Sequence, residues 1–307
     1  MKSALIDTLA AAAERDPSVV LLTGDLGYGA FEAFQERFPN RFINCGVAEQ
    51  NMLGVAGGMA AEGLRPVVYS IGNFLVLRAA EQIRNDVVAP RRPVLLVAAG
   101  GGFTYGAAGY SHHLTEDLAF MRSLPGLTVF TPSQVSDIGP MVSDWLNDPR
   151  PVYLRLDRPY SRPDASDQPL RLGHWRTVRT GRDVTVFGVG STVGVGLDAA
   201  DLLQEQGVSA RVVDCTQMTG LESASIDDLL TTSALAVTVE EHSVHGGLSS
   251  IVAEEITSRG LPIPLLRFGV HGAYAALVGR PAFLQQEYGM SAAAIAEAVI
   301  RRVSDRD

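Results

Sequence analysis

Short apolar runs alternate with helical stretches along most of this chain, and this alternation is the feature that most restricts its fold. In the first half, strands are predicted at residues 19–22, 42–45, 67–69, 94–98, 128–130 and 152–156. Alternating strands and helices are typical of a parallel sheet that is covered by helices on both faces. The first half is therefore predicted to be a doubly wound α/β domain.

The same pattern returns in the second half, after a segment rich in proline, serine and aspartate. Strands are predicted at 184–187, 210–213, 234–239 and 265–268, with helices near 193–206, 247–259 and 292–303. With 307 residues and 46% hydrophobic content, the chain is long enough to build two cores. We predict two doubly wound α/β domains, 1–160 and 173–307, joined by a linker over 161–172.

Composition excludes several classes of protein. The net charge of −9 argues against a nucleic-acid surface, because such surfaces carry a basic patch or stripe. No run of about 20 apolar residues occurs, and residues 1–15 lack the apolar core of a signal peptide, so we expect a cytoplasmic protein. Cys45 and Cys215 have no CxxC or histidine-spaced companions, which argues against a disulfide framework or a zinc site.

One carboxylate stands in an unusual place. The segment Gly-Val-Ala-Glu-Gln-Asn-Met (46–52) follows a predicted strand and opens a helix rich in glycine and alanine. Apolar residues at helical spacing predict that this helix is buried, with Glu49 in its first turn. The helix dipole and the free N–H groups stabilise an anion there, so a structural role and a chemical role both fit Glu49 on position alone.

A second candidate for chemistry is the histidine pair, His112 and His113. The pair follows a glycine-rich segment, 100–109, which predicts an exposed loop over a site. Two histidines without further ligands make a poor metal site. A histidine that titrates near neutral pH suits catalysis, whereas loop histidines also serve as simple hydrogen-bonding groups, so both roles stay open.

Several motifs follow one another along the chain: 46–52, Gly-Leu-Arg-Pro (63–66), Arg-Ala-Ala-Glu-Gln-Ile-Arg (78–84), Ser-His-His (111–113), Glu-Asp (116–117), Met-Arg (121–122), Leu-Pro-Gly (124–126), Tyr-Leu-Arg (153–155) and Glu-Glu-His-Ser (240–243). In order and approximate spacing, this set resembles the pyrimidine-binding and C-terminal domains of transketolases. Motifs in a shared order are more specific than any single motif. The resemblance covers nearly the whole chain.

The resemblance implies a chemical role for Glu49. In transketolases the glutamate at the matching position contacts N1′ of the aminopyrimidine ring of thiamine diphosphate. Glu49 is thereby implied to share a proton with N1′ and to favour the imino tautomer. The amino group of the cofactor then removes the proton from C2 of the thiazolium ring.

The resemblance also implies which residues surround the cofactor ring. Phe74 matches one of the aromatic residues that lie against the aminopyrimidine, and Ile71 and Leu77 stand at positions that are aromatic in typical transketolases. An apolar stripe at this spacing also fits a hydrophobic core. Aromatic stacking adds about 0.5–1.5 kcal/mol beyond area burial, so its partial loss predicts weaker cofactor binding. Asp25, in a turn after a strand, is implied to have a positioning role near the cofactor and the subunit interface.

For the substrate, the resemblance implies that His112 contacts hydroxyl and carbonyl oxygens, with His113 beside it in place of a common glutamine. Arg158 matches an arginine that binds substrate phosphate. Arg155 and Arg158 beside Asp157 could equally form a surface ion pair of little energetic weight.

The residue at position 108 departs from the family pattern. The acidic residue that contacts a sugar hydroxyl in transketolases falls at Ala108. The expected substrate is therefore a specialised one, with an unphosphorylated or unusual acceptor, and not a generic sugar phosphate.

A motif that transketolases need is missing. The chain contains no Gly-Asp-Gly, the sequence that helps to hold the diphosphate through a divalent metal. We therefore predict no metal ligand in this chain. A separate N-terminal transketolase-like subunit is expected to carry Gly-Asp-Gly and to hold Mg2+ or another divalent cation, in an α2β2 heterotetramer.

The leading hypothesis is the C-terminal subunit of a two-component transketolase-like transferase, which passes a two-carbon ketol unit from a ketose to an aldose. One alternative is the beta subunit of a 2-oxo acid dehydrogenase or decarboxylase. Another is a non-catalytic regulatory subunit that retains the fold. The segments 111–117 and 240–243 favour transketolase, whereas Ile71, Leu77 and Ala108 keep the regulatory alternative open.

Overall fold

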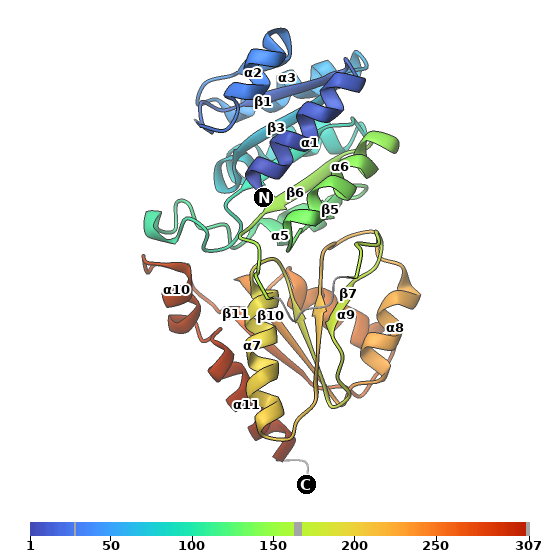
Figure 1. Ribbon diagram of the computed structural model, residues 1–307, viewed down its shortest axis with the longest axis vertical. Coiled ribbons are helices and arrows are strands. Elements are labelled where there is room, and N and C mark those ends of the chain that lie inside the picture. The colour runs from blue at the N-terminus through green and yellow to red at the C-terminus, as the bar shows by residue number, and fades with distance from the viewer. Residues whose placement is uncertain (28, 163–167, 305–307) are drawn as a thin grey trace.

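The computed structural model describes residues 1–27, 29–162 and 168–304. It contains two α/β units that follow one another along the long axis (Figure 1). The first unit holds a six-stranded sheet with the order β2-β1-β3-β4-β6-β5, and every neighbouring pair is parallel. Its strands are β1 (Val19–Thr23), β2 (Phe42–Asn44), β3 (Arg65–Ile71), β4 (Leu95–Ala99), β5 (Thr128–Phe130) and β6 (Val152–Leu156).

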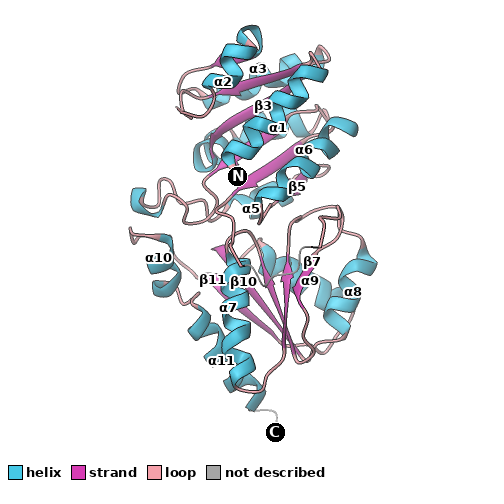
Figure 2. Cartoon of the chain, viewed as in Figure 1, coloured by secondary structure: helices cyan, strands magenta, loops and turns pink. Residues whose placement is uncertain are grey.

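Helices cover both faces of this sheet (Figure 2). Apolar side chains of α1 (Lys2–Arg15), α2 (Glu32–Arg37) and α6 (Ile138–Asn147) pack on one face, with Leu5, Phe34 and Trp145 in one cluster. Side chains from α3 (Glu49–Ala61) and α5 (Asp117–Arg122) pack on the other. Side chains of two π-helical turns, η2 (Phe74–Arg78) and η3 (Ile83–Val88), pack there too, and the short helix α4 (Ala80–Gln82) connects these turns. Short 3-10 turns complete the unit: η1 (Pro39–Arg41), η4 (Gly106–Ala108) and η5 (Val135–Asp137).

The second unit holds a five-stranded sheet with the order β11-β10-β8-β9-β7. Its strands are β7 (Arg176–Arg179), β8 (Val184–Gly188), β9 (Ala210–Asp214), β10 (Leu235–Ser243) and β11 (Leu265–Val270). The helices are α7 (Thr192–Glu205), α8 (Ser223–Thr231), α9 (Leu248–Ser258), α10 (Pro281–Glu287) and α11 (Ala292–Ser304). Side chains of α7 and α11 pack on one face, and those of α8 and α9 on the other. The prediction of two doubly wound α/β units is confirmed.

The edge strand β7 was not predicted from the sequence. It runs antiparallel to β9, whereas the other pairs in its sheet are parallel. The segment is four residues long and carries an arginine at each end, so it shows no apolar run. Strand formation here depends on pairing with β9, since the local pattern alone is too short to indicate it.

One hydrophobic cluster continues from the first unit into the second. It joins Leu118 and Met121 of α5 to Phe187 of β8 and Ile251 of α9. Trp175, beside β7, belongs to the same cluster and donates a hydrogen bond from its indole nitrogen to the carbonyl oxygen of residue 217. The two units therefore share buried surface.

A buried ion-pair cluster crosses the same boundary. Arg176 of β7 donates to Asp214 of β9 over 2.6 Å and to Asp137 of η5 over 3.0 Å. Ser133 also donates to Asp214. Burial raises the pKa of Asp214 to about 6, and the Arg176 charge opposes that rise. Two carboxylates thus share one guanidinium between the units.

The proposed domain boundaries stay a prediction. The first sheet ends at Leu156 and the second begins at Arg176. The predicted linker, 161–172, includes residues 163–167, which lie outside the described part of the chain. Within the described ranges, no helix combines the length and the apolar character that a membrane span requires.

Candidate functional site

Several residues singled out from the sequence follow the carboxyl ends of the strands of the first sheet. All six strands are parallel, so their carboxyl ends lie along one edge of the sheet. Asp25 follows β1, Glu49 follows β2, Phe74 follows β3 and His112 follows β4. Ligands of open α/β sheets bind outside this edge.

Glu49 is the first residue of α3, and its side chain is only 1% exposed. Its atom Oε2 lies 2.6 Å from Nη1 of Arg78. On the other side of the carboxylate, a methyl group added at Gly24 would lie 3.8 Å from Oε1. The absence of a side chain at Gly24 therefore leaves room beside one carboxylate oxygen while the other is paired.

Arg78 links Glu49 to the rest of the site. Its guanidinium carbon lies 4.8 Å from the centre of the Phe74 ring, and the Phe74 ring meets His112 edge-on with centroids 5.1 Å apart. A cation over an aromatic face is attracted by the ring quadrupole. Glu49, Arg78, Phe74 and His112 therefore form one continuous row of contacts.

Arg78 was not among the site residues predicted from the sequence. Its place at the start of the motif 78–84 was visible. Its orientation was not, because it depends on how η2 brings residue 78 back over Phe74 to the start of α3.

His112 is held by its neighbours. Nδ1 of His112 lies 3.0 Å from Oγ of Ser111. The backbone oxygen of Ser111 accepts a hydrogen bond of 2.5 Å from Nδ2 of Asn73, just before η2. The loop after β4 is thus tied to the loop after β3, which places the His112 ring beside Phe74.

His113 has different surroundings from His112. Its side chain is 2% exposed, with Nδ1 3.1 Å from the carbonyl oxygen of Ala275 and Nε2 3.2 Å from that of Gly106. Both ring nitrogens are occupied by backbone oxygens. The position of His113 therefore supports a structural role and not the expected substrate contact.

The apolar residues expected beside the cofactor ring differ in exposure. Leu77 is 54% exposed, whereas Phe74 and Ile71 are half-buried. The alternative that these three residues form a core stripe is wrong for Leu77. The segment winds as a π-helix, which changes the angle between successive side chains and turns Leu77 outward.

Asp25 supports the turn beside Glu49. Its backbone N–H donates to Oδ1 of Asn44, and its own Oδ1 accepts from Nδ2 of Asn44, over 3.0 and 2.9 Å. The N–H of Gly46 also donates to Oδ1 of Asn44. Asn44 thus ties the turn after β1 to the turn after β2. It was not predicted as a site residue, although its position at the end of a strand was a signal.

Arg158 lies apart from this row, after β6. Its Nη2 atom donates to Ser191 over 2.9 Å and to the buried carboxylate of Glu241 over 2.5 Å. Burial raises the pKa of Glu241, and the charge of Arg158 opposes that rise. No contact between Arg158 and Glu49, Phe74 or His112 is found among the described residues.

The alternative of a surface ion pair at Arg155 and Arg158 is wrong. Arg155 is buried, with Nε 3.0 Å from Oδ2 of the buried Asp117. Its Nη2 atom donates to the carbonyl oxygens of Leu114 and Glu241. Arg155 therefore joins the two units from inside.

The residues along this edge fit an aminopyrimidine ring. Glu49 offers a buried carboxylate for a ring nitrogen, and Phe74 and Leu77, from the same turn as Arg78, offer partly exposed apolar surface. The buried Oγ atom of Ser70 has no hydrogen-bond partner, and a methyl group at Gly24 would lie 3.6 Å from it. An unpaired hydroxyl near the carboxylate is suited to a ligand with polar ring atoms. Across the described ranges, no group of three histidine, cysteine or acidic side chains could hold a metal ion.

The fold and this site define a class: two α/β units, the first with a buried carboxylate at the carboxyl edge of its parallel sheet. Residues 1–163 match the transketolase pyrimidine binding domain, and residues 173–295 match the transketolase C-terminal domain. The chain belongs to the transketolase family and corresponds to these two domains. The resemblance inferred from the sequence motifs is confirmed.

Two relatives and one solved structure are similar over most of the chain. The 6-deoxy-6-sulfo-D-fructose transketolase subunit of Clostridium sp. (strain MSTE9) is 32% identical over 97% of this chain and 92% of its own length. A subunit of the apulose-4-phosphate transketolase of Phocaeicola vulgatus is 31% identical over 86% of each chain. The structure of a split gene transketolase, described as an inactive beta4 tetramer, has a TM-score of 0.84 and 33% identity over 97% of this chain and 96% of that chain.

Proposed function

We propose that this chain is the C-terminal subunit of a two-component, thiamine diphosphate-dependent transketolase-like transferase. The observation that carries the proposal is the row of contacts from the buried Glu49 through Arg78 and Phe74 to His112. A buried carboxylate and a histidine on one edge of a pyrimidine binding domain support the proposed roles of Glu49 in proton sharing and of His112 in substrate contact.

Each side chain along the edge has its own part in the proposed reaction. Glu49 would share a proton with N1′ of the aminopyrimidine through Oε1, because Oε2 is the oxygen that pairs with Arg78. Ile71, Phe74 and Leu77 would lie against the ring, and Asp25 holds the turn that carries Gly24 through its hydrogen bonds with Asn44. His112 contacts the hydroxyl and carbonyl oxygens of the substrate. When bound, thiamine diphosphate supplies the carbon nucleophile for ketol transfer.

A partner subunit completes the site. We propose that an N-terminal transketolase-like chain with a Gly-Asp-Gly motif holds Mg2+ and the diphosphate, in an α2β2 heterotetramer. The similar proteins support this, because two are subunits of transketolases and one is a split gene transketolase whose beta4 form is inactive.

The substrate is proposed to be a specialised ketose with an aldose acceptor. The names of the two relatives point to unusual sugars, one phosphorylated and one sulfonated. Ala108 is consistent with an unusual sugar, because it provides no carboxylate for a sugar hydroxyl. Arg158 is the proposed group for an anionic substituent, through a guanidinium that Glu241 and Ser191 orient.

Reconstitution tests the proposal. This chain, the partner chain, thiamine diphosphate and Mg2+ are mixed with β-hydroxypyruvate as the ketol donor and a series of aldoses as acceptors. We expect a ketose two carbons longer than the aldose, and only when both chains are present. Release of carbon dioxide from pyruvate would instead support the 2-oxo acid dehydrogenase or decarboxylase alternative. A mixture that binds the cofactor without activating it would support a regulatory subunit.

A further inference from the structure

The loop that carries His112 rests on the second unit. We call residues 104–113 the His112 loop and residues 275–279 the arm. The N–H of Gly279 in the arm donates to the carbonyl oxygen of Gly106 in the loop over 3.1 Å. A methyl group at Gly109 would lie 3.1 Å from Val278. In Figure 1 the loop projects from the first unit directly above α10, which follows the arm.

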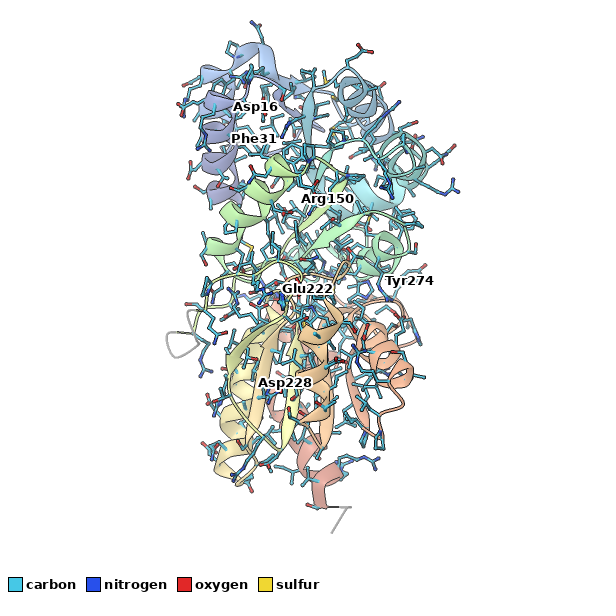
Figure 3. All side chains as sticks on the ribbon, turned by 90° about the vertical axis from the view of Figure 1, so that its right-hand side faces the viewer. Asp16, Phe31, Arg150, Glu222, Asp228 and Tyr274 are labelled. Atoms are coloured by element: carbon cyan, nitrogen blue, oxygen red, sulfur yellow. The ribbon has the colours of Figure 1, made fainter. Side chains whose placement is uncertain are left out.

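Tyr274, the residue before the arm, lies at the level where the two units meet (Figure 3). Contact between the loop and the arm therefore belongs to the boundary between the units, next to the proposed active site.

His113 makes the side-chain contact between loop and arm. One of its ring nitrogens faces Ala275 of the arm, and the other faces Gly106 of the loop, at 3.1 and 3.2 Å. Both partners are carbonyl oxygens, which only accept hydrogen bonds. A neutral imidazole donates to one of them at a time, and an imidazolium donates to both. The ring thus bridges the two units at a residue adjacent to His112.

A row of aromatic rings, of which Phe103 is buried and Tyr288 partly buried, continues from His113. The ring of Phe103 meets His113 edge-on at 5.3 Å and stacks on Tyr288 at 5.6 Å and 24°. The hydroxyl of Tyr288 accepts a hydrogen bond of 3.2 Å from the N–H of Leu277 in the arm. Phe103 also packs with Leu284, Met290, Val270 and Ala275 in a small hydrophobic cluster. The arm is therefore bound at two points: His113 contacts Ala275, and Tyr288 contacts Leu277.

We infer that His113 is a positioning residue that, together with Tyr288, fixes the arm of the second unit against the His112 loop and so sets where His112 faces Phe74. The backbone N–H groups of His112 and His113 both donate to the carbonyl oxygen of Gly109. Residues 109–113 form one hydrogen-bonded turn, so a displacement of the His113 ring also displaces His112. This inference rests on the proposed function for its catalytic consequence, and it gives the second unit a direct part in shaping the active site.

Two measurements on the same variants test the inference. The variants are His113→Ala, His113→Gln and Tyr288→Phe, with His271→Ala as the matched control, because His271 is exposed and contacts one backbone oxygen. Hydrogen exchange of the His112 loop is measured by mass spectrometry in this chain and in its complex with the partner. Turnover of β-hydroxypyruvate with an aldose, and the Kd for thiamine diphosphate, are measured in the complex.

We expect His113→Ala to speed hydrogen exchange of the amides of the His112 loop at least about fivefold. Without the His113 contacts the loop opens more often, and amides exchange when the loop is open. Turnover should fall about 10- to 100-fold, since a displacement of about 1 Å at a catalytic group costs that much. KM and the cofactor Kd should stay within about twofold, in keeping with a change in positioning and not in binding. His113→Gln, which retains one amide donor, should recover most of the turnover, and Tyr288→Phe should show a smaller loss.

Unchanged loop exchange in both His113→Ala and Tyr288→Phe would overturn the inference. So would wild-type turnover in a His113→Ala complex whose loop exchanges faster. Should the wild-type complex show no transfer activity, the proposed function fails, and the exchange measurement still decides whether His113 and Tyr288 hold the loop. Should His113→Ala fail to fold, Tyr288→Phe decides, because it removes a single hydroxyl group.

Discussion

Nη1 of Arg78 lies 2.6 Å from Oε2 of Glu49, so the carboxylate proposed to activate the cofactor is already paired with a cation. The pair is asymmetric, because the Glu49 side chain is 1% exposed and that of Arg78 is 43% exposed. Arg78 can therefore balance the buried charge through Oε2 while Oε1 stays available toward Gly24. On this account Arg78 is the support of Glu49, and the proton is shared at the opposite oxygen.

Replacement of Arg78 by a neutral residue should destabilise the fold, because the buried Glu49 carboxylate would then have no cation beside it. We expect Arg78→Gln to lower the free energy of unfolding by about 1–2 kcal/mol, because a buried charge loses its partner while the partly exposed arginine side limits the loss. Arg78→Lys should lose less. Urea unfolding of both variants, alone and combined with Glu49→Gln, gives the coupling energy between the two residues. Additive effects of Arg78→Gln and Glu49→Gln would show that the pair does not interact.

The space at Gly24 should matter for the cofactor more than for the fold. A methyl group there would meet its neighbours at 3.6 Å or more, which is ordinary contact, so Gly24→Ala should fold normally. It would occupy the side of Oε1 that the ring nitrogen needs, and we expect the Kd for thiamine diphosphate in the complex to rise about tenfold, or about 1.4 kcal/mol. Gly139→Ala, at an open position of α6, is the control. An unchanged Kd in Gly24→Ala would place the ring elsewhere.

An aromatic side chain at position 77 should tighten cofactor binding. Leu77 is exposed beside the site, so Leu77→Tyr can present a ring without displacing a core residue. Stacking worth about 0.5–1.5 kcal/mol predicts a fall in Kd of about 2- to 12-fold. The control is Leu202→Tyr on α7, another exposed leucine, which should leave the Kd unchanged. Equal effects of Leu77→Tyr and Leu202→Tyr on the Kd would show that Leu77 does not contact the cofactor.

The contact between the units should respond to pH through Asp214. Burial raises its pKa to about 6 from an ordinary value of 3.8, so between these values the folded state binds a proton that the unfolded state releases. The contribution of this group to the free energy of unfolding is fully present below about pH 4. It decreases as the pH rises from about 4 to about 6, and the total decrease is at most roughly 3 kcal/mol. Asp214→Asn should flatten this part of the pH profile of unfolding, whereas the exposed Asp7→Asn should not. A profile of Asp214→Asn that keeps the wild-type slope would contradict this origin.

The sequence carried much of this arrangement in local patterns. Apolar runs indicated the strands, and the motif 46–52 indicated that Glu49 follows a strand and lies in the first turn of a helix with a buried face, as the structure has it. What the sequence could not indicate were directions set by distant contacts. Arg155 is buried by Asp117, and His113 turns toward Ala275, more than 150 positions away. Strand β7 and the orientation of Arg78 depend in the same way on neighbours that no short window contains.

Exchange of the C2 proton of thiamine diphosphate tests the central claim most directly. Both chains are mixed with cofactor and Mg2+ in heavy water, and the exchange rate is followed by NMR after acid quench for the wild type, Glu49→Gln and the exposed control Glu62→Gln. We predict that Glu49→Gln folds and assembles but loses at least about 100-fold in rate, the scale of a general acid–base contribution, while Glu62→Gln exchanges as the wild type does. Exchange at the wild-type rate in an assembled Glu49→Gln complex would contradict the account.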